Sequence, residues 1–130
     1  MSHWLRRLEP LLLIAAGGFV GAALRFAVAE IMPAGALPWG TLAANVTGAF
    51  LLSILLYENR LVGALNPETR LVVGTGFCSS FTTYSTFAVE TAELAQTPGL
   101  PLFAVVNVAL NYALGFAAIG LGQAVARVIA

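Results

Sequence analysis

The stretch Gly74–Phe87 reads GTGFCSSFTTYSTF and lies inside an apolar segment that runs from Leu71 to Leu94. Seven hydroxyl-bearing residues fill the eight positions from 79 to 86, interrupted only by Phe81. Glycine and short hydroxyl side chains both weaken a regular helix. At membrane depth, irregular backbone is tolerated only where it is buried in protein or lines a wet cavity. The stretch therefore predicts a membrane-spanning helix that is broken near its middle and lines a polar path.

The composition places the whole chain in a membrane. Of its 130 residues, 59% are hydrophobic and 9% are charged, and the mean hydropathy is +0.89. Four apolar stretches, at about residues 11–31, 39–57, 71–94 and 102–128, can each cross a hydrocarbon core of about 30 Å. The links between them are short. We therefore expect one all-α domain over residues 1–130, with four transmembrane helices of which the third is broken.

Uncharged polar residues recur at helical spacing inside these spans. Thr41 and Asn45 lie four apart in the second span, and Asn107 and Asn111 lie four apart in the fourth, so each pair shares a helix face. Such residues either form hydrogen bonds between helices or line a polar path. For Asn45 the two interpretations stay equal. Two asparagines on one stripe favour a polar track along the fourth span.

The charges restrict the kind of solute. Arg25 is the one charge well inside a span, and it indicates a structural or vestibule role more than snorkelling to the interface. The chain contains no Asp, and we take Glu90 and Glu93 as solvated charges at a helix end. Cation pathways and proton relays generally use intramembrane carboxylates. The pattern therefore favours an anion or a small neutral solute.

No catalytic machinery is visible in the sequence. It shows no nucleophile with a base and an orienting group, no metal-ligand cluster and no phosphate-binding loop. An enzyme is therefore not expected. Tyr84 and Phe87 are three residues apart, so their rings share a face if the helix resumes after the break. Their electropositive ring edges could assist an anion, but on spacing alone ordinary packing is the better explanation.

Three motifs, in this order, carry a family resemblance: GGFVGAALRF (17–26), PWGTLAANVTGAF (38–50) and GTGFCSSFTTYSTFAVET (74–91). With them the chain resembles the CrcB/Fluc family of small fluoride channels, from Gly17 to about Gly122. The resemblance implies an antiparallel, dual-topology dimer with two narrow pores in the cell inner (plasma) membrane. It also implies passive export of fluoride, which lowers the toxic concentration in the cytoplasm, and no nucleic-acid partner.

The resemblance also assigns roles to residues. Asn45 matches a pore asparagine, and Tyr84 and Phe87 match two phenylalanines whose ring edges face the fluoride path. Arg25 matches an arginine of the first span. Asn107 and Asn111 fall where relatives often carry Tyr and Ser in a polar track. The implied fluoride pathway comprises Asn45, Thr83, Tyr84, Ser85, Thr86, Phe87, Asn107 and Asn111.

A structural sodium ion is implied at the dimer axis. The backbone carbonyls of Ser79 and Thr82 match its ligands, and two such pairs would suit a hard cation that prefers oxygen. Ser79 and Ser80 stand where the family commonly has a glycine pair. Any requirement for positive φ at Ser79 would therefore strain the backbone.

The distribution of arginines bears on the identity of the partner subunit. With four spans, both termini and the middle loop lie on one side, and Arg6, Arg7, Arg60, Arg70 and Arg127 all fall there. The positive-inside rule predicts a single orientation from this bias, whereas a homodimer with inverted subunits should show little bias. A homodimer remains the favoured prediction, and a heterodimer with an inverted homologue remains open.

Two other functions compete with a fluoride channel. A small four-span, proton-coupled multidrug exporter needs a mid-span carboxylate, and Glu30 at the end of the first span is poorly placed for that role. A non-transporting membrane assembly subunit would not require the hydroxyl-rich break. The sequence therefore predicts a fluoride-selective channel.

Overall fold

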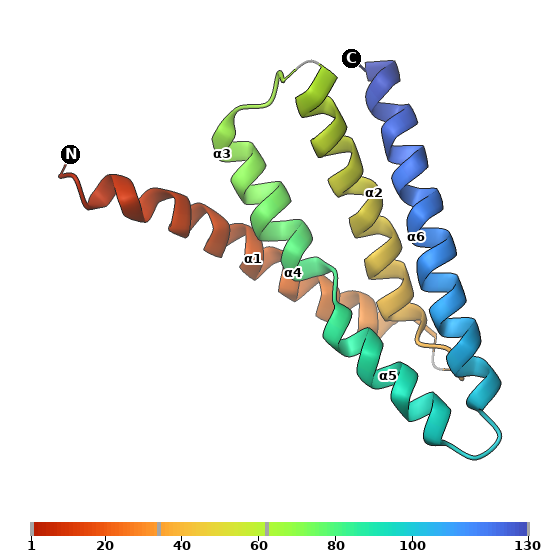
Figure 1. Ribbon diagram of the computed structural model, residues 1–130. Coiled ribbons are helices and arrows are strands. Elements are labelled where there is room, and N and C mark those ends of the chain that lie inside the picture. Colours follow the sequence, from red (N-terminus) through yellow and green to blue (C-terminus); the bar gives the residue numbers. More distant parts are fainter. Residues whose placement is uncertain (1, 34, 62, 130) are drawn as a thin grey trace.

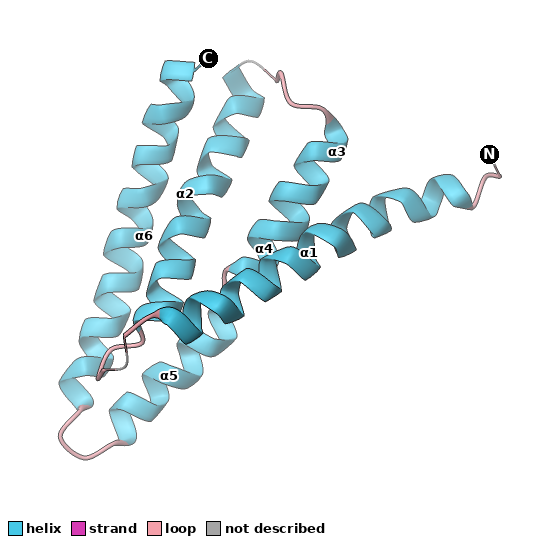
Figure 2. Cartoon of the chain, turned by 180° about the vertical axis from the view of Figure 1, so that it is seen from behind, coloured by secondary structure: helices cyan, strands magenta, loops and turns pink. Residues whose placement is uncertain are grey.

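The computed structural model describes residues 2–33, 35–61 and 63–129, and these ranges contain helices and no strand. The all-α prediction is confirmed. The elements are α1 (Leu5–Ile31), α2 (Trp39–Leu61), α3 (Pro67–Thr69), the π-helix η1 (Arg70–Cys78), α4 (Ser79–Phe81), α5 (Tyr84–Gln96) and α6 (Pro101–Ile129). Helices α2 and α6 run side by side, whereas α1 crosses the segment that holds η1 and α4 (Figure 1, Figure 2).

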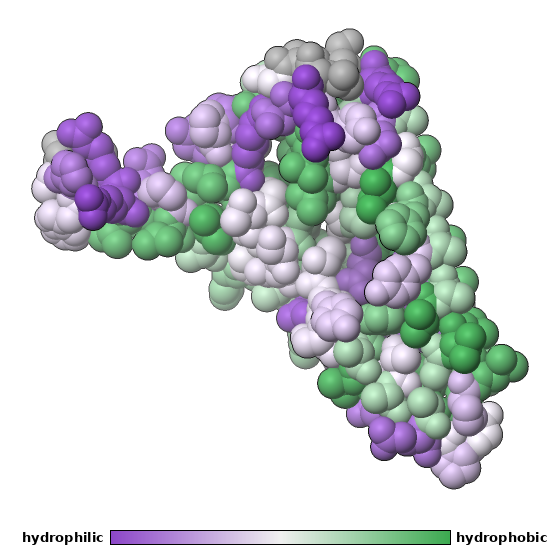
Figure 3. All heavy atoms as spheres, in the orientation of Figure 1, coloured by the Kyte–Doolittle hydropathy of each residue, from purple (hydrophilic) through white to green (hydrophobic). Residues whose placement is uncertain are grey.

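Three of the described helices are long and apolar enough to cross a membrane: α1, α2 and α6. They cover the first, second and fourth predicted spans, although α1 begins at Leu5, before the predicted start at residue 11. Their outward faces carry large apolar side chains such as Phe19, Phe26 and Phe116. On the face shown in Figure 3, hydrophobic residues lie along α1 and α6. The chain is thus a multi-pass membrane protein.

The third predicted span, residues 71–94, is divided into η1, α4 and α5. Thr82 and Thr83 leave the helical conformation, with φ/ψ of −80°/157° and −150°/124°. A new helix begins directly afterwards because the Thr83 hydroxyl accepts a hydrogen bond from the Thr86 N–H at 3.1 Å and so caps α5. Ser79 is right-handed helical (φ −65°), so positive φ does not strain it.

Glycines bring α1 against η1 at backbone distance. A side chain at Gly17 would overlap the carbonyl oxygen of Val72, and one at Gly21 would overlap that of Phe77. From the other side, a Cβ at Gly76 would lie 2.7 Å from the Ile14 carbonyl oxygen. Small residues permit this approach between membrane helices. The glycine contact, as we name Gly17, Gly21 and Gly76, holds the first part of the broken segment on α1.

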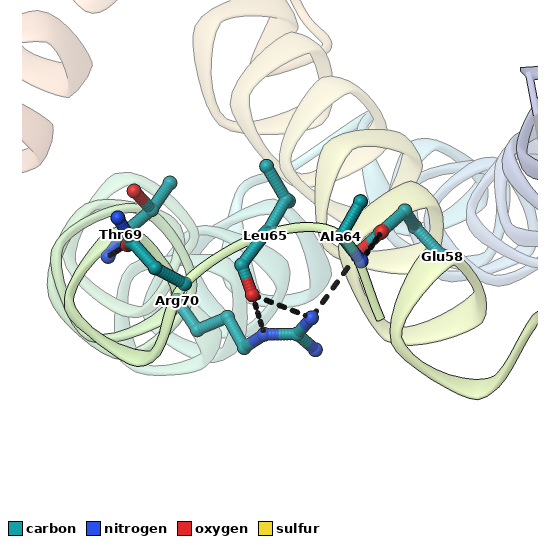
Figure 4. Close-up of polar contacts among 6 residues, drawn as sticks. Glu58, Ala64, Leu65, Thr69 and Arg70 are labelled. Carbon is teal, nitrogen blue, oxygen red and sulfur yellow. Dashed lines mark hydrogen bonds and ion pairs between the residues drawn. The ribbon is translucent and has the colours of Figure 1, made fainter. Parts of the chain in front are cut away.

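The start of η1 is tied to the end of α2 (Figure 4). Arg70 donates from Nε and Nη2 to the Leu65 carbonyl at 3.0 and 2.9 Å, and its Nη2 lies 3.4 Å from Glu58 Oε2. Glu58 Oε1 accepts from the Ala64 N–H at 2.6 Å. These bonds fix the connection between α2 and the broken segment, and therefore where the break meets α2.

Candidate functional site

A cavity of about 370 Å³ lies where α2, the break, α5 and α6 meet. Five residues of the predicted pathway line it, although they come from three separate parts of the sequence. Its lining consists of Asn45, Gly48, Ala49, Leu52, Thr82, Thr83, Tyr84, Phe87, Asn111, Tyr112 and Gly115. No carboxylate belongs to this lining, so the cavity presents neutral donors and aromatic rings.

The Asn45 side chain joins α2 to the break. Its Oδ1 accepts from the Thr83 N–H at 2.8 Å, and its Nδ2 donates to the Thr83 carbonyl at 3.1 Å and to Asn111 Oδ1 at 3.2 Å. The Asn45 oxygen therefore replaces the helical acceptor that the Thr83 N–H loses where the chain leaves the helix. In this arrangement Asn45 both stabilises the break and lies on the cavity wall.

The two asparagines of α6 differ in position. Asn111 lines the cavity, whereas Asn107 is 1% exposed and lies outside the lining. Asn111 Nδ2 donates to the Asn107 carbonyl at 2.9 Å and to Asn107 Oδ1 at 3.1 Å. Asn107 Nδ2 donates to the Thr91 hydroxyl at 3.0 Å. The predicted stripe exists, but one of its members is buried between α5 and α6.

Aromatic rings form a row beside the amides. The ring centroids of Tyr84 and Phe87 lie 6.2 Å apart, and Phe87 meets Tyr112 edge to face at 6.4 Å and 78°. The structure thus brings Tyr84 and Phe87 to the same cavity, as their spacing indicated. Whether their edges contact an anion stays a prediction.

A second cavity of about 480 Å³ is lined by α1 and the break. Arg25 lines it, together with Ser79, Ser80 and Ser85, and Thr82, Thr83 and Tyr84 belong to both cavities. Arg25 and Asn45 therefore line different cavities that share the same short piece of irregular backbone. Of the remaining predicted residues, Ser85 lines only this second cavity. Thr86 lines neither and bonds to Thr83 instead.

Two carbonyl oxygens at the break lose their regular helical donors. In a continuous helix the Thr83 N–H would bond to the Ser79 carbonyl, but here it donates to Asn45. The Thr86 N–H would bond to the Thr82 carbonyl, but here it donates to the Thr83 hydroxyl. Both oxygens can therefore take another partner, and oxygen is the ligand that hard cations prefer.

Comparison with known proteins identifies the family. Residues 12–123 match the family described as CrcB-like protein, Camphor Resistance (CrcB). This chain belongs to the CrcB family. It is 51% identical over 115 residues to fluoride-specific ion channel FluC 1 of Natronomonas pharaonis, which covers 88% of this chain and 92% of that relative.

Two further relatives match almost the whole of this CrcB chain. The identity is 47% over 129 residues with fluoride-specific ion channel FluC 1 of Haloarcula marismortui, covering 99% of this chain and 94% of the relative. With fluoride-specific ion channel FluC 2 of Methanosarcina barkeri it is 35% over 129 residues, covering 99% and 96%. The relatives are named as ion channels, so the family resemblance and the expectation of a non-enzyme are both confirmed.

Sequence reasoning about this CrcB chain was wrong on Glu90. It is partly buried in α5, its Oε1 accepts from the Thr41 hydroxyl at 2.9 Å, and its Oε2 is buried with no partner among the described residues. It is therefore not a freely solvated charge at a helix end. The spacing of Thr41 and Asn45 on one face of α2 could not show this bond, because it depends on how α5 lies against α2. Glu93, in contrast, is exposed.

Two other residues of the site were not predicted from the sequence. Tyr112 lines the cavity beside Asn111 and packs its ring against Phe87. Thr91 accepts the hydrogen bond from Asn107. Neither could be found from spacing within one helix, because each depends on how α5 lies against α6.

Proposed function

We propose that this CrcB-family protein is a fluoride-selective channel that passively exports fluoride from the cytoplasm. The observation that carries the proposal is the cavity at the break, where Asn45, Asn111 and Thr83 meet the rings of Tyr84, Phe87 and Tyr112 without any carboxylate in the lining. The names of relatives that are up to 51% identical support the choice of fluoride.

The chemistry of the lining suits a small, strongly hydrated anion. Such an ion leaves water only where donors of similar strength replace its hydration shell. Amide and hydroxyl groups are such donors. Because Asn45 Nδ2 donates to the Thr83 carbonyl and to Asn111 Oδ1, an anion would compete with one of these oxygens for it. The ring edges of Phe87 and Tyr84 add a weaker positive potential. In the second cavity, the guanidinium of Arg25 would attract anions toward the break.

The exposed break supports a second subunit. Tyr84 is 76% exposed, and Ser79, Ser85 and Thr86 are also exposed in the single chain. Irregular backbone with polar side chains is not tolerated against lipid. We propose that an inverted copy covers this surface, giving an antiparallel dimer of four-span subunits with two pores.

The identity of that copy can be tested by topology. The arginine bias predicts one orientation in the plasma membrane, whereas the proposed homodimer needs both. Reporters of membrane side, fused after residue 130 and expressed in cells that lack any homologue, should show both orientations. A single orientation would replace the homodimer by a heterodimer with an inverted homologue.

We also propose a structural sodium ion between the subunits. The carbonyls of Ser79 and Thr82, which have lost their helical donors, would supply two oxygens from each chain. Dimers purified in sodium should then resist dissociation in detergent better than dimers purified in a large organic cation. Equal resistance in both salts would remove the ion from the proposal.

The function itself is tested by fluoride efflux from liposomes that contain only this chain, with chloride efflux as the reference. We expect rapid, fluoride-selective efflux, and we expect Asn45→Asp to reduce it at least about tenfold because a negative charge enters the path. Asn66→Asp is the matched control, since Asp caps a helix as well as Asn does and Asn66 caps α3.

Two results would contradict the proposal. Unchanged fluoride efflux in folded Asn45→Asp would remove Asn45 from the pathway. Absence of efflux from the folded wild-type chain, alone and together with an inverted homologue, would exclude the channel function.

A further inference from the structure

Four side chains beside the cavity donate hydrogen bonds in one direction. Asn45 donates to Asn111, Asn111 donates to Asn107, and Asn107 donates to Thr91. The Thr91 hydroxyl donates in turn to the Phe87 carbonyl at 2.7 Å. The series crosses from α2 to α6 and then to α5. We name these four residues the amide relay.

The direction of the relay is set at its far end. A backbone carbonyl can only accept, so the Thr91 hydroxyl gives its hydrogen to Phe87 and has only lone pairs left for Asn107. Asn107 must then present its NH₂ group to Thr91 and its oxygen to Asn111. Asn111 in turn presents its oxygen to Asn45. Each amide thereby fixes which way the next amide faces.

The near end of the relay requires the same orientation. The Thr83 N–H is a donor and needs Asn45 Oδ1 as its acceptor, which leaves Asn45 Nδ2 for Asn111. A flipped Asn45 would point its NH₂ group at the Thr83 N–H and its oxygen at Asn111 Oδ1. Both contacts would be repulsive. The amide relay on one side and the Thr83 backbone on the other therefore fix the same orientation of the Asn45 side-chain amide.

We propose that Asn107 and Thr91 are positioning residues that orient the pathway amides of Asn111 and Asn45, without contacting the ion. Asn107 is 1% exposed, and neither Asn107 nor Thr91 lines either cavity at the break. The sequence prediction that placed Asn107 on the pathway is thereby refined. The flux readout of this inference rests on the proposed function, whereas its spectroscopic readout does not.

The decisive variant changes a residue that lines neither of the two cavities at the break. Thr91→Val keeps the shape of the side chain but removes the hydroxyl on which the relay ends. Losing the orientation that one hydrogen bond provides should lower fluoride efflux roughly three- to tenfold and raise the chloride-to-fluoride ratio. Thr91→Ser restores the hydroxyl and should restore both values.

The matched control is Thr97→Val. The Thr97 hydroxyl also donates to the carbonyl four residues earlier, that of Glu93, at 2.7 Å, but it is exposed and contacts no amide. It should leave efflux and selectivity at their wild-type values. If Thr91→Val also leaves both unchanged, or if Asn107→Leu alters selectivity while Thr91→Val does not, the positioning role is wrong.

A second measurement does not require the protein to conduct fluoride. The chain has five asparagines, so selective labelling gives five pairs of side-chain amide signals in an NMR spectrum. Thr91→Val should shift the amide signals of Asn107, Asn111 and Asn45, and leave those of Asn59 and Asn66 in place. A shift confined to Asn107 would overturn the relay, even if the proposed channel function stands.

Discussion

The glycine contact and the amide relay hold two parts of the same bundle together by opposite means. Where α1 meets η1, side chains are absent and backbone lies against backbone at Gly17, Gly21 and Gly76. Where α2 meets α5 and α6, the helices are joined by polar side chains that span the space beside a cavity. The junction of α1 with η1 leaves no space for a solute, whereas the junction of α2 with α5 and α6 borders a cavity.

The difference follows from what can drive association in lipid. Apolar side chains gain little by leaving lipid for protein, so close packing and hydrogen bonds remain as the forces between helices. Close packing gives a rigid junction with no space for a solute. Hydrogen bonds can hold helices apart at a fixed distance, which is the arrangement that a polar path requires.

Gly17→Ala is expected to have the largest effect on stability. Its Cβ would meet the backbone of Val72 and Phe77, which cannot rotate away, so we expect a loss of stability of about 3 kcal/mol. Gly120→Ala is the control, because nothing lies within 4 Å of a Cβ there. Thermal unfolding in detergent measures both. Equal melting temperatures for the two variants would show that the glycine contact is not close-packed.

Gly122→Ala tests whether α2 and α6 also depend on close approach. Its Cβ would lie 2.7 Å from the Phe50 carbonyl oxygen and 2.8 Å from the Cβ of Ser53. Since a Cβ at Gly17 would approach the Val72 backbone more closely than this, we expect a smaller loss of about 1–2 kcal/mol at Gly122 in the same unfolding assay. A loss as large as that of Gly17→Ala would make the two junctions alike and weaken the distinction.

A double-mutant cycle measures how strongly the amide relay joins α2 to α6. Asn45→Ala and Asn111→Ala should be coupled by about 1 kcal/mol in the free energy of unfolding, since each removes one partner of the same hydrogen bond. Asn45→Ala with Asn66→Ala should be additive, because these residues share no contact in the described structure. Additivity in both pairs would mean that the amide relay does not hold α2 to α6.

The smallest effect is expected at the connection between α2 and η1. Glu58→Gln keeps an oxygen for the Ala64 N–H but removes the charge that faces Arg70 at 3.4 Å. Glu58 is buried, but this contact is long and Arg70 keeps both of its hydrogen bonds to the Leu65 carbonyl, so we expect a loss of roughly 1 kcal/mol or less. Unfolding should therefore change little and fluoride efflux not at all. A large loss of stability or of efflux would show that this connection matters as much as the glycine contact and the amide relay.

Spacing along single helices predicted much of the fold. The four-residue step from Gly17 to Gly21 indicated a face for close contact, and the hydroxyl-rich stretch indicated a break, which the structure places at Thr82 and Thr83. Spacing could not show which element meets that glycine face, because residues of α1 and η1 are far apart in the sequence.

Spacing within single helices also predicted part of the candidate site, but not the contacts between helices. Asn45, Tyr84 and Phe87 do lie at one cavity. The burial of Asn107 against Thr91, and the bond between Thr41 and Glu90, depend on the rotation of α5 relative to its neighbours. No pattern within a single helix reports that rotation.

The break also has a consequence for how the chain enters the membrane. The continuous helical run of α3, η1 and α4 (residues 67–81) and the 13-residue α5 each fall short of the roughly 20 residues that a helix needs to cross on its own. Each half packs on a long helix instead, η1 on α1 and α5 on α6. During synthesis α1 is made before η1, and α6 is made after α5. The first half can therefore dock as soon as it leaves the ribosome, whereas the second half reaches its place only when α6 is complete.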